Sequence, residues 1–90
     1  MNVQFKMTIA NIYSLSDGPS LTGRIESGIV QIGDDLQIVS SNGIYPVRVI
    51  GIEAFQKSLK IASSENGLVG ISVSGIDAKS VKNRDVLRSV

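Results

Sequence analysis

The sequence predicts an all-β protein, a sandwich or a small closed or nearly closed antiparallel β-barrel of six or so short strands, on three observations. Twelve Ile and ten Val make 22 of the 90 residues β-branched aliphatics, whereas Ala and Leu number only four and six. Nine Gly and thirteen Ser supply turn residues. Short apolar runs recur between turn signals roughly every 8–12 residues, as in small barrels. We expect one domain over residues 1–90.

The first predicted strand covers residues 3–12. Its apolar residues alternate with polar ones and therefore share one face: Val3, Phe5, Met7 and Ile9. The alternation ends at Ala10-Asn11, which predicts a bulge or a bend. Residues 14–20 are expected to form a loop, because Asp17-Gly18-Pro19 is turn chemistry.

Three further strands are expected at residues 21–26, 30–32 and 36–39, separated by turns. The glycines between and within them, at positions 23, 28 and 33, do not belong to a sequence repeat. We interpret Gly23, Gly28 and Gly33 as structural turn or close-packing positions.

Asn42-Gly43 is the strongest local signal, because an Asn-Gly pair between apolar runs predicts a type I′ hairpin turn. The strand returning from it covers residues 44–55. Pro46 must face away from the hydrogen-bond ladder or lie at an edge. Val47 and Val49 point one way and Ile50 and Ile52 the other, as expected where a long strand bends.

The last third of the chain predicts less regular structure. Residues 56–66 read as a polar connection and residues 68–74 as a strand. A single helical turn is expected at 77–81, with Asp77 as its N-cap. A final strand is expected at 85–90.

Composition excludes several kinds of chemistry. The chain has no Cys and no His, so disulfides, thiol catalysis and imidazole acid–base catalysis are ruled out. Gly23 and Gly28 have the spacing of a phosphate-binding loop, but Ile29-Val30 follows where Lys-Ser/Thr is required. We therefore expect no enzyme, no cofactor and no metal site. No apolar run is long enough for a membrane span, and no signal peptide is recognisable, so the expected location is cytoplasmic.

Charge and aromatic residues give only weak hints of a partner. The net charge is +1, with −2 in residues 1–45 and +3 in residues 46–90. Of the four aromatic residues, Phe5 and Phe55 are expected in the core, whereas Tyr13 and Tyr45 lie beside turns. Nothing resembles an aromatic platform for stacking bases.

One stretch resembles a known family. Residues 21–36 read Leu-Thr-Gly-Arg-Ile-Glu-Ser-Gly-Ile-Val-Gln-Ile-Gly-Asp-Asp-Leu. This closely resembles the signature of the second domain of translational GTPases of the elongation factor Tu type. Weaker matches follow in the same order at residues 51–57, 68–76 and 85–87. The resemblance covers residues 5–87.

This resemblance implies a six-stranded barrel that packs against a GTPase domain and contacts the small ribosomal subunit. In the Tu branch, the barrel also holds the aminoacyl end of tRNA. Glu53 matches the family's glutamate near the terminal adenosine. The neighbouring family positions differ, since an acidic pair reads Ala10-Asn11, an arginine reads Gln56 and a glycine reads Arg84.

The resemblance also implies roles for charged residues on the strands. Arg24 and Glu26 are expected to face outward with opposite charge, available to pair with each other. If RNA is the partner, phosphates rather than bases should be contacted, because the chain offers cations but few aromatic residues. The RNA-binding candidates are Arg24, Arg48, Glu53, Lys57, Lys60, Lys82 and Arg84.

Two functional hypotheses follow. The first is a non-catalytic translation-factor module that binds ribosomal RNA, tRNA or a translation-related protein, with the ribosome or a GTPase-domain protein as partner. The second is a protein–protein interaction scaffold, or a homo-oligomer of the barrel, without a nucleic-acid role. Salt-dependent RNA binding favours the first hypothesis, and a concentration-dependent mass favours the second.

Overall fold

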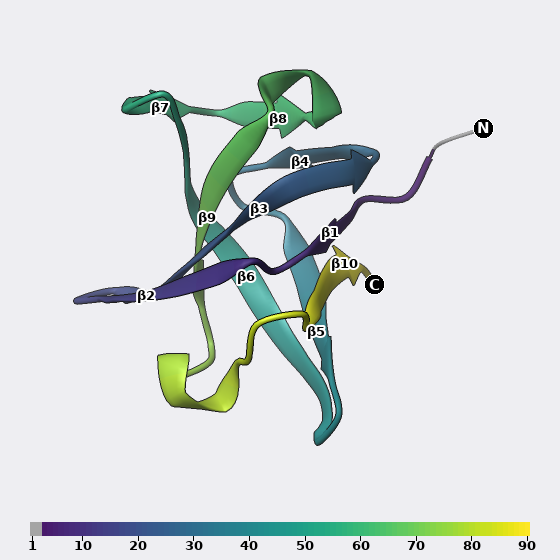
Figure 1. The fold of residues 1–90 in the computed structure, drawn as a ribbon, viewed down its shortest axis with the longest axis vertical. Helices are drawn as coiled ribbons and strands as arrows, with labels where there is room; N and C mark the ends of the chain where they lie inside the picture. The colour runs from purple at the N-terminus through teal and green to yellow at the C-terminus, as the bar shows by residue number, and fades with distance from the viewer. Residues whose placement is uncertain (1–2) are drawn as a thin grey trace.

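The computed structural model describes residues 3–90, which form ten strands and two short 3₁₀ helices (Figure 1). In chain order these elements are β1 (Lys6–Thr8), β2 (Asn11–Leu15), β3 (Gly18–Ser27), β4 (Ile29–Gln31), β5 (Asp35–Ser40), β6 (Gly43–Ala54), β7 (Lys57–Leu59), β8 (Ile61–Ser63), η1 (Ser64–Asn66), β9 (Leu68–Ser74), η2 (Ala78–Ser80) and β10 (Val86–Ser89). The expectation of an all-β chain is confirmed.

Six of these strands close into an antiparallel barrel, as predicted. Their order is β1-β10-β5-β6-β9-β3, and the pairing of β1 with β3 completes the circle. Figure 1 shows the early strand β1 beside the late strand β10. Strands β4 and β8 form a separate two-stranded sheet. The barrel is filled by alternate residues of the strands, among them Met7, Leu21, Ile38, Ile71 and Leu87.

The first predicted strand is interrupted where its alternation fails. The N–H groups of Ile9 and Ala10 bond to different neighbours, the carbonyl oxygens of Asp85 at 2.8 Å and Thr22 at 2.7 Å. The chain therefore leaves β10 at Ile9 and joins the outer part of β3 as β2. The predicted loop at 14–20 is wrong, because β2 and β3 continue through it as a hairpin with only Ser16 and Asp17 between them.

The long strand β6 resets its alternation by a bulge. The register with β9 shifts between Val49 and Gly51, so one extra residue, Ile50, projects outward with 39% exposure. Val49 and Ile52 on either side of the shift are both buried. The bulge explains why both faces of this stretch carry apolar residues.

The type I′ turn predicted at Asn42-Gly43 is wrong. The loop between β5 and β6 consists of Ser41 and Asn42, neither of which has the positive φ that type I′ requires, and Gly43 already belongs to β6. Positive φ at two consecutive loop residues occurs instead at Phe55 and Gln56, with φ of 52° and 63°, between β6 and β7. This turn is not predictable from the sequence, because Phe and Gln rarely adopt a positive φ.

The three signature glycines lie in two different environments. Gly28 and Gly33 occupy turns with φ of 74° and 95°. Gly23 instead lies inside β3, where a Cβ would stand 2.5 Å from the carbonyl oxygen of Thr8. Its role is thus close packing of β3 against β1 and not a turn.

The polar connection predicted at 56–66 contains more structure than expected. It holds β7, β8 and η1, which begins with a capping box between Ser63 and Asn66. The helical turn expected at 77–81 is present as η2, but the side chain of Asp77 makes no capping hydrogen bond.

Candidate nucleic-acid interface

A small hollow lies beside the turn between β6 and β7. It measures about 260 Å³, and we call it the Glu53 hollow. It is lined by Tyr13, Ser20, Thr22, Glu53, Ala54, Phe55, Gln56, Leu68, Val69 and Gly70. Two aromatic side chains, a carboxylate, an amide and two hydroxyls thus surround one cavity, which suits a flat ligand with polar edges.

Phe55 was expected in the core, and this expectation is wrong. Its side chain is 82% exposed, the highest value among the large apolar residues that the structure describes. Its φ of 52° is rare for a bulky residue and costs about 1–2 kcal/mol. The hairpin therefore holds an aromatic ring in water on a strained backbone, an arrangement that is concentrated at functional sites.

A second hollow lies on the other side of Leu68 and brings two predicted cations together. It measures about 630 Å³ and is lined by Thr8, Ile9, Ala10, Gly23, Arg24, Glu26, Leu68, Asn83 and Arg84. We call it the arginine hollow. Its two arginines are 60 positions apart in the sequence, and the closure of β1 against β3 and β10 brings them to one place.

The backbone holds Arg84 at the rim of this hollow. Its N–H donates to the carbonyl oxygen of Ile9 at 2.7 Å, and its φ of 78° is again unusual for a residue other than glycine. The next residue, Asp85, is buried, and its carboxylate accepts from the N–H of Lys82 at 2.9 Å. These two hydrogen bonds fix the segment before β10 and leave the side chain of Arg84 exposed.

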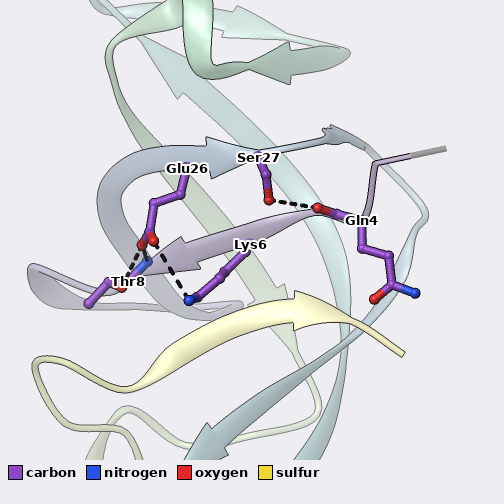
Figure 2. A network of polar contacts seen from close by, with 5 residues as sticks. All are labelled: Gln4, Lys6, Thr8, Glu26 and Ser27. Atoms are coloured by element: carbon purple, nitrogen blue, oxygen red, sulfur yellow. Dashed lines mark hydrogen bonds and ion pairs between the residues drawn. The ribbon is translucent and has the colours of Figure 1, made fainter. Parts of the chain in front are cut away.

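Glu26 does not pair with Arg24, contrary to the expectation. Its carboxylate instead accepts hydrogen bonds from the N–H of Thr8, at 2.9 Å, and from the Thr8 hydroxyl, and it lies 3.8 Å from the ammonium of Lys6 (Figure 2). These contacts, chiefly the hydroxyl bond, lower the pKa of Glu26. Within residues 3–90, Arg24 has no ion pair, so its charge is available to a ligand.

The other predicted cations do not join this surface. Arg48 is engaged with Asp35 through a fork of two hydrogen bonds, 2.9 Å and 3.3 Å long, that lowers the pKa of the carboxyl and raises that of the guanidinium. Lys57 lies on β7, and Lys60 lies between β7 and β8. Lys82 precedes Arg84, but it does not line the arginine hollow. Tyr13 and Phe55 were not among the sequence candidates.

Two further features concern the part of the chain that the structure describes. No group of three or more acidic side chains is placed to hold a metal ion. No helix is long and apolar enough to cross a membrane.

The comparison with protein families decides the relationship. The family model of elongation factor Tu domain 2 matches residues 18–87, which is more than half of the chain. The chain belongs to this family. Domain 2 of translational GTPases is a non-catalytic barrel module, and the match includes the β3–β5 signature as well as β6 and β9.

Solved structures agree with the domain 2 assignment. The chain is similar to the translation elongation factor SelB from Methanococcus maripaludis, in its apo form, with 30% identity and a TM-score of 0.85. The same SelB in complex with the GTP analogue GppNHp gives 30% identity and a TM-score of 0.86. Each match covers 96% of this chain but only 18% or 19% of the SelB chain.

Proposed function

We propose that this domain 2 module binds a single-stranded RNA end, with a base in the Glu53 hollow and phosphates at the arginine hollow. The observation that carries the proposal is the shared wall, since Leu68 lines both hollows. A base-sized cavity next to two exposed guanidinium groups matches the two parts of a nucleotide. A role in translation would also place the module at the ribosome and in the cytoplasm.

The residues of the Glu53 hollow support recognition of a base. The exposed ring of Phe55 and the ring of Tyr13 offer apolar faces on which a base can stack. The carboxylate of Glu53 accepts hydrogen bonds only, so it favours bases with an exocyclic amino group at their edge. Gln56, where the family resemblance has an arginine, makes the hollow less cationic and leaves the phosphate contacts to Arg24 and Arg84.

Salt titration tests the phosphate part of this proposal. We would measure fluorescence anisotropy of a short labelled RNA that ends in an unpaired adenosine. Arg24→Ala and Arg84→Ala should each flatten the slope of log K against log salt by about 0.7. Lys79→Ala is the matched control, because it removes an exposed cation that lines neither hollow and should leave the slope unchanged. Equal slopes for all four proteins would contradict the proposal.

A protein-binding scaffold is the second candidate, and one observation favours it. Ile29, Ile32 and Ile61 are exposed by 57%, 47% and 50% on or beside the small β4–β8 sheet. Exposed apolar residues gathered in this way mark interaction surfaces. A molecular mass that rises with concentration in light scattering, together with undetectable RNA binding, would support this second candidate.

A further inference from the structure

The outer edge of β2 is unpaired. Strand β2 pairs with β3 and with no other strand that the structure describes. Ser14 stands opposite Pro19, which has no N–H, so this pair lies at a position without mutual hydrogen bonds. By the alternation of an antiparallel ladder, the backbone N–H and C=O groups of Ser14, and those of Ile12 two residues earlier, point away from β3.

A cleft lies against one face of the β2–β3 hairpin, since residues of both strands line it. It measures about 580 Å³, and we call it the β2 cleft. Its walls are the hairpin and the segment that carries η2: Ser14, Leu15, Ser16, Asp17, Gly18, Pro19, Tyr45, Gly75, Ile76, Asp77, Ala78 and Ser80. Figure 1 shows η2 facing the hairpin. Ser14 thus belongs both to the lining of the cleft and to the strand edge with free donors and acceptors.

The charge of the β2 cleft is negative. Two carboxylates, Asp17 and Asp77, line it, and no lysine or arginine does. Neither carboxylate forms an ion pair within residues 3–90. Tyr13 lines the Glu53 hollow, whereas Ser14, the next residue, lines the β2 cleft. Because successive side chains of a strand point to opposite faces, the cleft and the proposed RNA-binding hollow lie on opposite faces of the hairpin.

We propose that the free edge of β2 binds an extended, lysine- or arginine-bearing peptide segment of a partner protein as an added strand, and that the cationic side chains of this peptide reach over Ser14 into the β2 cleft. Backbone groups of the peptide would bond to Ser14 and Ile12, as in other cases of strand addition to a sheet edge. Its cationic side chains would pair with Asp17 and Asp77. A phosphate backbone is disfavoured here, because it would meet two carboxylates and no cation.

The test uses defined peptides and does not depend on RNA binding. The probe is an octapeptide that alternates Lys with Val, and its charge control replaces each Lys with Glu. Amide chemical shifts of the isotope-labelled chain are followed by NMR during titration. We expect saturable shifts over residues 12–18 and 75–80, and binding of the Lys peptide about tenfold tighter than that of the Glu peptide.

Two changes separate the strand edge from the charge. Ser14→Pro removes the outward donor without removing a bond to β3, and should weaken binding at least about fivefold, whereas Ser14→Ala should not. Asp17→Asn together with Asp77→Asn should abolish the preference for Lys over Glu. Because Ser14→Pro could unfold the hairpin, a Lys peptide N-methylated at alternate residues tests the same bonds with the unmodified chain.

Three results would overturn the proposal. The first is the absence of localised shifts up to about 5 mM peptide at low salt, a range that includes weak, transient binding. The second is equal binding of the N-methylated and unmethylated Lys peptides. The third is that shifts over residues 12–18 arise on concentrating the chain without peptide, which would assign the edge to a second copy.

Discussion

The seam where β1 meets β3 is expected to be the part of the barrel least tolerant of added volume, and Gly28→Ala tests this. Gly28 combines a φ of 74° with close packing, since a Cβ there would stand 2.5 Å from the backbone N and 2.6 Å from the Cα of Phe5. Phe5 is 2% exposed and hydrogen-bonds to Ser89 of β10. A methyl group at this position would therefore push Phe5, and with it the start of β1, away from the end of β3.

Substitutions of Gly33 and Gly23 separate the two expected causes of the loss of stability, which are backbone strain and close packing. At Gly33 the φ is 95° and nothing lies within 4 Å of a Cβ, so Gly33→Ala carries only the backbone strain. That strain of about 1–2 kcal/mol, less about 0.4–1 kcal/mol from the stiffer unfolded chain, leaves roughly 0–1.6 kcal/mol. At Gly23 the φ is ordinary, but a Cβ would lie 2.5 Å from the Thr8 oxygen, which costs about 1–3 kcal/mol as overpacking.

Gly28→Ala combines backbone strain with overpacking, and we expect it to lower the free energy of unfolding by about 2–4 kcal/mol. This is a large part of the roughly 5–13 kcal/mol expected for the stability of 90 residues. Urea unfolding followed by circular dichroism measures the free energy of unfolding of the three variants. A loss for Gly28→Ala no greater than that for Gly33→Ala would refute the close packing of the seam, because both positions have a positive φ and only Gly28 is also crowded.

Three other predictions concern the charged network, the strained hairpin and nucleotides. Contacts with Thr8 and Lys6 lower the pKa of Glu26 in the folded protein, so this carboxylate stabilises the fold above the ordinary glutamate pKa of about 4.3. This stabilisation is lost as the pH falls through the lowered pKa of the folded state. The urea midpoint of Glu26→Gln should therefore fall less than that of the wild type between pH 7 and pH 3. Phe55→Gly should raise stability by about 0.5–1 kcal/mol, because it relieves the left-handed backbone of an exposed residue, and should weaken RNA binding; a loss of stability would show that the ring packs in the folded state. Calorimetry should detect no binding of GTP, because Ile29-Val30 replaces the Lys-Ser/Thr of a phosphate loop, and micromolar affinity would contradict this reasoning.

Patterns with a strict period made the barrel predictable. The alternation of Phe5, Met7 and Ile9 places these residues in the core, and its failure at Ala10 marks the place where the chain changes neighbours. The two apolar faces of residues 47–52 likewise indicate a bend, which the bulge at Ile50 provides. In each case one local rule and the tertiary structure agree.

Features that depend on distant contacts were not predictable. β7 and β8 have only three residues each, too few for a period to be visible. Phe55 was placed in the core because it is aromatic, but the paired positive φ values of Phe55 and Gln56 turn its side chain into solvent. The approach of Arg24 to Arg84 requires the barrel to close, and no local pattern contains this information.

The same closure has a consequence for the time course of folding. The N–H of Phe5 bonds to the Ser89 side chain 84 positions away, and Lys6 of β1 stands opposite Arg88 of β10. On a ribosome, β1 would leave the exit tunnel before the other strands of this barrel and would have to wait for residues 86–89 before one of its two edges could be paired. The hairpin of β5 and β6 has no such delay, because its partners are adjacent in the chain. Synthesis would thus produce a half-formed sheet with an open β1 edge, and the slow step would be the late docking of the last strand.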